Sequence, residues 1–231
     1  MARVLGLQQL LQKKYQYIDI PQNIKESFGD LVSNFIMIVW GQSGNGKSSF
    51  LMQFIKPLME VGKVLYVSLE EGFEASIQKN VLRHLTEEHL GKIEFADYEM
   101  TFEKLCLKLS KRKSPQFIII DSLQYWNINY ETYKRLKEKF PRKTFIFISH
   151  ANGKNPDGKT ATQIRYDSPI KVRVEGYVCF IVSRYGGNKP FVIWEAGAKK
   201  YWGDKYNAII KGVDNQKKKK KPKNEEANTD E

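Results

Sequence analysis

Residues 41–48 read Gly41-Gln42-Ser43-Gly44-Asn45-Gly46-Lys47-Ser48, the most informative segment of the chain. It matches the pattern G-x-x-x-x-G-K-[ST] in full. The apolar run Phe35–Trp40 precedes it, and a helical pattern of apolar residues (Phe50, Leu51, Phe54 and Ile55) follows it. A strand, a glycine-rich turn and a helix in this order are typical of a loop that binds phosphate groups through backbone N–H donors.

The residue types of this loop suit a nucleoside triphosphate. Gly41, Gly44 and Gly46 allow backbone N–H groups to turn inward. We expect Lys47 to contact the β- and γ-phosphates and the Ser48 hydroxyl to ligate Mg²⁺. The predicted cofactors are therefore ATP and Mg²⁺, bound by Gly41, Gln42, Ser43, Gly44, Asn45, Gly46, Lys47, Ser48 and Ser49.

Three further strands are predicted to end in polar residues that complete this site. Phe117–Ile120 leads into Asp121, which we expect to be the second metal ligand. Val64–Leu69 leads into Glu70 and Glu71, of which one, preferably Glu70, would orient the attacking water. The alternative for these glutamates is a solvated strand end.

The third of these strands, Thr144–Ser149, leads into His150. A histidine at this place can hydrogen-bond a γ-phosphate and transmit its presence to the loop that follows. The predicted catalytic set is therefore Lys47, Glu70, Glu71, Asp121, His150 and, from the resemblance described below, Arg184.

Alternation of apolar runs with helical patterns predicts an α/β fold with a mostly parallel central sheet. Tyr177–Val182 and Phe191–Trp194, joined through Gly186–Lys189, are expected to form a C-terminal antiparallel hairpin. We predict one ATPase domain over residues 30–213, a lead-in segment over 1–29 and a disordered charged tail over 214–231.

Composition limits the possible classes of protein. The chain has 231 residues, 41% of them hydrophobic, which is enough for one ordinary core. It lacks an apolar run long enough to span a membrane and a signal-peptide pattern, and its two cysteines form no metal-binding or disulfide framework. These features predict a cytoplasmic protein that does not insert into membranes.

The charge balance favours a polyanionic partner. The formal net charge is +12, and the sequence pI is about 9.5. Residues 214–231 contain six lysines and five acidic residues, so nearly all of the excess lies in residues 1–213. Nucleic acid is the natural partner for such a surface, although many basic proteins have no such partner.

The complete series of motifs resembles the RecA-like core ATPases, most closely the RadA and DnaB branch, from about Asp30 to Glu195. Val67–Glu71 resembles the strand with the catalytic glutamate, Ile120–Gln124 the Walker B segment, and Ser183–Gly186 the K-N-R-F-G signature of RadA. Val182 stands where that signature has lysine. The resemblance covers the motor core only, and it implies a ring or filament of identical subunits with ATP between them.

The resemblance also implies contacts outside the nucleotide loop. Residues 151–165, polar and expected to be flexible, resemble a DNA-binding loop with Lys154, Lys159 and Arg165 as phosphate contacts. Arg184, Lys171 and Arg173 are candidates to complete a neighbouring subunit's site, the alternative being solvated residues on an edge strand. Tyr125, Trp126, Tyr130 and Tyr133 could stack on bases, or some of them could belong to the core.

The predicted function is a DNA-stimulated ATPase that acts on single-stranded DNA in replication, recombination or repair. The alternative is an ATP-dependent oligomeric switch, or a kinase-type protein that acts on a protein or a nucleotide. Small GTPases are disfavoured, because no Asn-Lys-x-Asp motif follows the later strands.

Overall fold

A computed structural model describes residues 4–212 of the chain. Its main sheet has eight strands in the order β10-β9-β8-β1-β5-β4-β2-β3. The strands are β1 (Ile36–Trp40), β2 (Val64–Ser68), β3 (Ile93–Ala96), β4 (Phe117–Asp121), β5 (Thr144–Ser149), β8 (Ile170–Glu175), β9 (Val178–Ser183) and β10 (Phe191–Val192). The six strands from β8 to β3 in this order are parallel, whereas β9 pairs antiparallel with both β8 and β10. The predicted α/β class, with a mostly parallel sheet and a C-terminal antiparallel hairpin, is confirmed.

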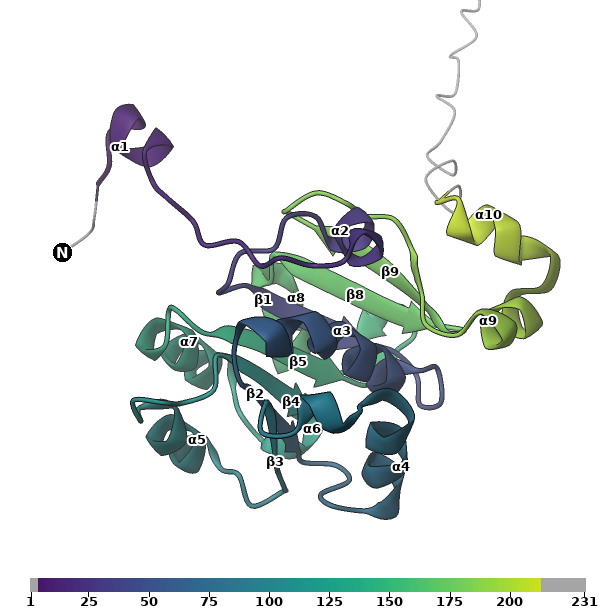
Figure 1. Ribbon diagram of the computed structural model, residues 1–231, viewed down its shortest axis with the longest axis horizontal. Helices are drawn as coiled ribbons and strands as arrows, with labels where there is room; N and C mark the ends of the chain where they lie inside the picture. The colour runs from purple at the N-terminus through teal and green to yellow at the C-terminus, as the bar shows by residue number, and fades with distance from the viewer. Residues whose placement is uncertain (1–3, 213–231) are drawn as a thin grey trace, which may run out of the picture.

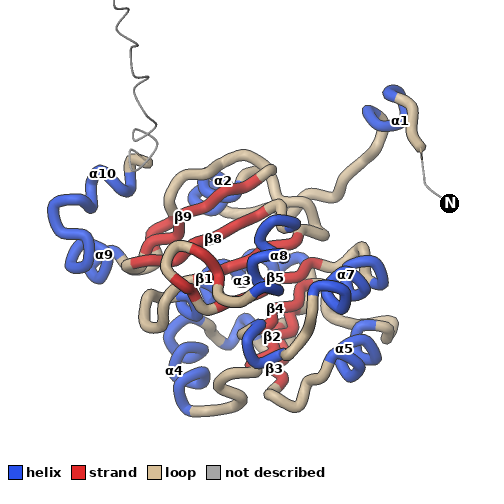
Figure 2. Tube along the Cα trace, turned by 180° about the vertical axis from the view of Figure 1, so that it is seen from behind, coloured by secondary structure: helices blue, strands red, loops and turns tan. Residues whose placement is uncertain are grey.

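Helices cover both faces of the sheet (Figure 1). The helices are α1 (Leu7–Leu11), α2 (Gln22–Phe28), α3 (Lys47–Val61), α4 (Ala75–His84), α5 (Phe102–Leu109), α6 (Leu123–Trp126), α7 (Tyr130–Lys139), α8 (Lys159–Asp167), α9 (Glu195–Trp202) and α10 (Tyr206–Ile210). One core joins α2, α3 and α4 to the sheet. A second core joins α5, α6, α7 and α8 to the other face of the sheet, which is turned towards the viewer in Figure 2.

The central strands are buried on both faces, as their continuous apolar sequences predict. In β1, Met37 and Val39 belong to the first core, whereas Ile36, Ile38 and Trp40 belong to the second. This division follows from the alternation of side chains along a strand. A strand of this kind must lie inside the sheet, and β1 is hydrogen-bonded on both sides, to β5 and to β8.

Local sequence signals fix several helix ends. The Thr101 side chain accepts a hydrogen bond from the N–H of Lys104 at the start of α5, and Asn129 caps α7 in the same way. The helix α3 begins directly after Gly46, whose φ of 100° is in the left-handed region. The P-loop therefore passes into α3 with its first N–H groups free of intrahelical partners.

Two parts of the fold were not predicted. The strand β3 was missed. The strand β8, considered only as an edge strand with Lys171 and Arg173, instead lies between β1 and β9 and makes the longer hairpin with β9, from Ile170↔Ser183 to Glu175↔Val178. The expectation of a flexible loop over residues 151–165 was wrong. This segment forms a short hairpin, β6 (Ala151–Asn152) with β7 (Asn155–Pro156), and then α8, because Ala161 and Ile164 are buried against the sheet.

The two ends of the described chain differ in their packing. The helix α1 stands away from the body, whereas α2 lies on it (Figure 1), with Ile24 and Phe28 in the first core. At the other end, α9 and α10 pack against β9 through Ala198 and Ile209. The predicted disordered tail, 214–231, lies outside the described residues. None of the helices over residues 4–212 is long and apolar enough to cross a membrane.

Candidate nucleotide-binding site

The topology brings the predicted motifs to one edge of the sheet. The P-loop follows β1, Glu70 follows β2, Asp121 ends β4 and His150 follows β5, and these four parallel strands are neighbours in the order β1-β5-β4-β2. Their carboxyl ends therefore meet, which is where open α/β sheets bind ligands. A cavity of about 900 Å³ opens there, lined by P-loop residues, Glu70, Glu71 and Asp121.

The P-loop depends on its glycines and on one lysine. Gly44 has a φ of 75°, and Gly46 a φ of 100°. At Gly41, a Cβ atom would lie 2.3 Å from the carbonyl oxygen of Val174, so only glycine fits. The Lys47 ammonium donates to the carbonyl oxygens of Gly41 at 2.8 Å and Gln42 at 3.2 Å. These bonds hold the ammonium at the loop, where a phosphate could replace the carbonyl oxygens as its partner.

The electrostatic environment of Lys47 and Asp121 suits a bound cation. Burial lowers the pKa of Lys47, while the nearby Asp121 and Glu70 act in the opposite direction. Burial also raises the pKa of Asp121 to about 6 from its usual 3.8. The hydroxyl of Tyr66, a buried residue of β2, donates a hydrogen bond to Asp121 Oδ2 and opposes that rise. A divalent cation beside Asp121 would stabilise its carboxylate.

The two adjacent glutamates have different partners. Glu70 Oε2 lies 2.9 Å from His150 Nε2 and accepts a hydrogen bond of 3.4 Å from Ser122 Oγ. Glu71 instead accepts a hydrogen bond of 2.6 Å from Ser76 Oγ at the start of α4. Glu70 is thus held between the ends of β4 and β5, beside Asp121, whereas Glu71 is engaged with α4.

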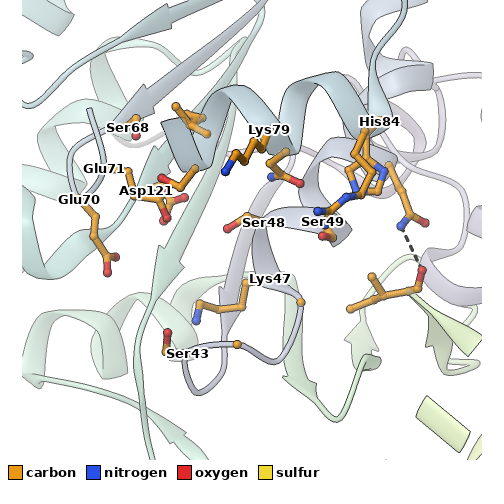
Figure 3. Close-up of a pocket in the computed structure, with 18 of the residues that line it drawn as sticks. Ser43, Lys47, Ser48, Ser49, Ser68, Glu70, Glu71, Lys79, His84 and Asp121 are labelled. Atoms are coloured by element: carbon orange, nitrogen blue, oxygen red, sulfur yellow. Dashed lines mark hydrogen bonds between the residues drawn. The ribbon is translucent and has the colours of Figure 1, made fainter. Parts of the chain in front are cut away.

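Figure 3 shows how these side chains are distributed along the cavity. Glu70, Glu71 and Asp121 lie at one end of the view, Lys47 and Ser48 in the middle, and His84 at the opposite end. The helix α4 forms one wall and contributes Lys79, Asn80, Arg83 and His84. No sequence motif marks these α4 residues, and their place at the cavity depends on how α4 packs beside α3.

Gln124 and the P-loop residue Gln42 join the nucleotide motifs to the 151–157 hairpin, the segment that contains β6 and β7, and this role of the two glutamines was not predicted. Gln124 Nε2 donates to Ser149 Oγ and to the Asp157 carbonyl, both at 2.9 Å, and Gln124 Oε1 accepts from the His150 N–H at 3.2 Å. The Gln42 amide donates to the Ala151 carbonyl at 3.0 Å. The hairpin is therefore bonded directly to the P-loop and to the segment that follows Asp121.

The remaining predicted cations do not line this cavity. Arg165 lies over the Trp40 ring at 5.4 Å and donates to Asn155 Oδ1 at 3.2 Å, so it holds the 151–157 hairpin. Lys154 is exposed on that hairpin, and Lys159 is exposed at the first position of α8. Burial, with the charges of Arg184 and Arg165, lowers the pKa of Lys171. Lys171, Arg165 and Arg184 are thus close enough to interact electrostatically.

Arg173 and the aromatic residues have structural contacts. Arg173 pairs with Glu175 and lies over the Phe180 ring at 4.3 Å. Trp126 and Tyr133 are buried in the second core, whereas Tyr125 is 53% exposed, with its ring 6.0 Å from that of His150. Of the four aromatic side chains considered for base stacking, two therefore belong to the core.

The residues present fit a metal held mainly by phosphate oxygens. Within residues 4–212 there is no group of three or more His, Cys, Asp or Glu side chains that could hold a metal ion by themselves. Mg²⁺ in phosphate-transfer sites keeps few protein ligands and takes the others from water and phosphate. Ser48 and Asp121, which line the same cavity, are the residues that would hold it.

Part of the sequence is similar to RadA proteins. A 98-residue segment, 42% of this chain, is 40% identical to the DNA repair protein RadA of Streptococcus pneumoniae and spans 22% of that protein. The RadA protein of Escherichia coli is 28% identical over 96 residues, which make up 20% of its length. The chain thus matches about a fifth of the length of these relatives. No protein-family model matches the sequence.

Solved structures are similar to this chain over most of its fold. The flagellar accessory protein FlaH of Methanocaldococcus jannaschii has a TM-score of 0.57 and 17% identity, over 78% of this chain and 95% of its own. A KaiC-like protein of Pyrococcus horikoshii has a TM-score of 0.55 and 18% identity, over 74% of this chain and 88% of its own. The chain thus has the RecA-like core fold, and the predicted resemblance to RadA is confirmed for the matched segment.

Proposed function

We propose that this chain binds ATP with Mg²⁺, hydrolyses it, and does so faster on single-stranded DNA. One observation carries the proposal: a complete P-loop, Asp121 and Glu70 converge on a single cavity, and His150 holds Glu70 at 2.9 Å. The partial likeness to proteins named for DNA repair supports the choice of DNA as the partner.

The side chains divide the chemistry among themselves. The P-loop N–H groups and Lys47 bind the phosphates, and Ser48 and Asp121 hold the metal. Mg²⁺, when bound, neutralises charge that develops on the transferred phosphoryl group. Glu70 orients a water molecule and accepts its proton, while His150 fixes the direction of the Glu70 carboxylate. Glu71, which is bonded to Ser76, has a supporting role at most.

DNA contact is assigned to the side of the molecule that carries the 151–157 hairpin. Lys154 and Lys159 are exposed there, and Arg165 adds a third cation that is bonded to Asn155 of the same hairpin. Cations of this kind bind phosphates without reading sequence. The net charge of +12 also favours a polyanionic partner. We therefore assign Lys154 and Lys159 to the phosphate backbone of a single strand.

Assembly into a homo-oligomer is the third part of the proposal. Leu7 and Leu11, on the helix that stands away from the body, are 74% and 76% exposed. Arg184 is exposed and does not line its own cavity. These observations support an arrangement in which α1 packs on a neighbouring copy and Arg184, rather than the ion-paired Arg173, reaches the neighbour's phosphates.

The test is the steady-state ATPase rate with and without single-stranded DNA, with Lys47→Ala as the blank. We expect a rise of about tenfold with DNA that is lost at high salt, because phosphate contacts release counterions. A rate that Lys47→Ala leaves unchanged would exclude this site as the source of turnover. If DNA does not change the turnover rate, the switch or kinase alternative is favoured. An assay for transfer of phosphate from ATP to an acceptor would then distinguish a kinase from a switch.

A further inference from the structure

The cavity has a phosphate end and a second end that the proposed reaction does not use. The helix α3 runs from Lys47 at the phosphate end to Gln53, a distance of roughly 9 Å at 1.5 Å per residue. Beyond Ser49 the lining includes Gln53, Asn80, His84, Tyr177, Ile193 and Trp194. Figure 3 shows His84 far from the carboxylates of Glu70, Glu71 and Asp121. A nucleotide whose terminal phosphate lies at Glu70 and whose other phosphates lie along the P-loop would extend its base towards this second end.

Two polar atoms at the second end lack partners. Asn80 Oδ1 and His84 Nε2 are buried and make no hydrogen bond to any residue in the described part of the chain. An unsatisfied buried polar atom is unfavourable, because the group has given up its hydrogen bonds to water without a replacement. The two residues are four apart on α4 and so share one face of the helix, the face that lines the cavity. A ligand that gave both atoms partners would remove this cost.

The neighbouring Gln53 is not available to hydrogen-bond a ligand, which leaves Asn80 and His84 for this role. The Gln53 amide is already engaged, because Nε2 donates to the Ile193 carbonyl at 3.1 Å. Burial and the nearby cations Lys56 and Arg83 lower the pKa of His84, so the imidazole is neutral at neutral pH. It thus offers hydrogen bonds without attracting a phosphate to this end of the cavity.

The chemistry of the two side chains fits an adenine base. A side-chain amide pairs with the amino group and a ring nitrogen of adenine, its oxygen accepting and its nitrogen donating. Ile193, which is 8% exposed, and the rings of Tyr177 and Trp194, whose centroids are 5.1 Å apart, provide apolar and aromatic surface for the faces of a planar base.

We propose that Asn80 and His84 form the nucleobase subsite of this cavity and select adenine, with Asn80 Oδ1 accepting from the exocyclic amine. This inference rests on the proposed nucleotide site and adds its base specificity. Because inosine triphosphate carries a carbonyl oxygen where ATP carries the amine, it presents no donor to Asn80 Oδ1. Tripolyphosphate has no base and reports the phosphate end alone.

The experiment measures by calorimetry the affinities of the full chain for ATP, inosine triphosphate and tripolyphosphate. Asn80→Leu removes the amide at similar size, His84→Phe keeps a ring without polar atoms, and Gln78→Leu is the matched control on an exposed position of α4 outside the cavity. For the wild type and Gln78→Leu we expect ATP to bind about tenfold tighter than inosine triphosphate, the effect of one good hydrogen bond.

In Asn80→Leu that preference should fall to less than about twofold, and His84→Phe should weaken ATP by about tenfold. Tripolyphosphate should bind all four proteins equally, which also verifies that the variants fold. The inference is overturned if the wild type does not prefer ATP, or if both variants keep the preference and the affinity. Failure of every ligand to bind the wild type would instead remove the nucleotide site itself.

Discussion

At the scale of single residues, Asp121 is held where its charge is unfavourable. Its pKa is raised to about 6, so ionisation costs more in the folded chain than in the unfolded chain, where the pKa is about 3.8. A carboxyl shifted in this direction contributes stability below pH 4 and loses it as the pH rises towards 6. In the absence of a cation, the ionised side chain therefore opposes folding at neutral pH.

Asp121→Asn should remove this penalty. We expect the variant to be more stable than the wild type at pH 8 by roughly 2–3 kcal/mol, at 1.36 kcal/mol for each pKa unit. Near pH 4 the two proteins should be equally stable. Urea unfolding without Mg²⁺ or nucleotide, repeated from pH 4 to pH 8, measures the difference. A difference that is constant over this range would show that Asp121 keeps an ordinary pKa.

The pair Glu70 and Glu71 gives a sharper test of the reaction. Glu70→Gln should keep ATP binding and lower turnover at least about a hundredfold, because a general base commonly contributes 10²–10⁴. Glu71→Gln is the matched control, and it should lower turnover far less because the Glu71 carboxylate is bonded to Ser76. Single-turnover hydrolysis with a separate binding assay distinguishes the two steps. If Glu71→Gln lowered turnover more than Glu70→Gln, Glu71 would be the catalytic residue instead.

Residues of the site could be predicted from sequence where a motif is contiguous. Gly41–Ser49 and the strand ends at Glu70, Asp121 and His150 lie next to apolar runs, so their position follows from the strands. Tyr66 lies inside such a run and reads as a core residue, and only the register Ser68↔Asp121 brings its hydroxyl to Asp121. Partners that meet across strands leave no local pattern.

At the scale of elements, the 151–157 hairpin is attached to the nucleotide motifs at several points. Gln124 alone bonds Ser149, the His150 N–H and the Asp157 carbonyl. Gln42, from the P-loop, and Trp40, from the end of β1, bond the hairpin carbonyls of Ala151 and Lys154. A shift of the P-loop or of His150 would therefore be transmitted to the exposed Lys154.

Gln124→Leu should separate the hairpin from the nucleotide motifs. We expect ATP binding to persist, hydrogen exchange of residues 151–157 to become faster and insensitive to ATP, and stimulation by DNA to be lost. Gln116→Leu is the control, since Gln116 bonds the Ser33 and Arg142 carbonyls near the start of β4 rather than its end. Both variants should lose about 1–3 kcal/mol of stability. Equal exchange profiles in the two variants would contradict a specific role for Gln124.

Elements with long apolar runs were predicted, whereas shorter elements that also carry charged residues were missed. The strand β8 alternates buried Ile170, Val172 and Val174 with half-buried charged residues, a period of two that is typical of a strand, but its place inside the sheet depends on its pairing with β1. The helix α8 has only Ala161 and Ile164 as buried residues. Both are stabilised by tertiary contacts with the sheet rather than by their own sequence.

At the scale of the whole molecule, the helix α1 is unusual because its apolar side chains are exposed. Leu7, Leu10 and Leu11 are 74%, 52% and 76% exposed, and none of the five residues of α1 is buried. An isolated helix of this length is unstable in water. Its apolar side chains would be covered if α1 packed on another copy of the chain, which fits the proposed oligomer.

Replacing Leu7 and Leu11 together by Gln should therefore shift the chain to a smaller assembly without loss of the core. These leucines are largely exposed and belong to none of the hydrophobic clusters of residues 4–212, so the unfolding free energy of the monomer should change by less than about 0.5 kcal/mol. Light scattering after gel filtration measures the mass, and Gln8→Ala with Gln9→Ala on the same helix is the control. If subunits share sites through Arg184, ATP turnover should fall with the mass of the assembly while ATP binding remains. An unchanged mass would assign α1 another partner, and a monomeric wild type would refute the assembly outright.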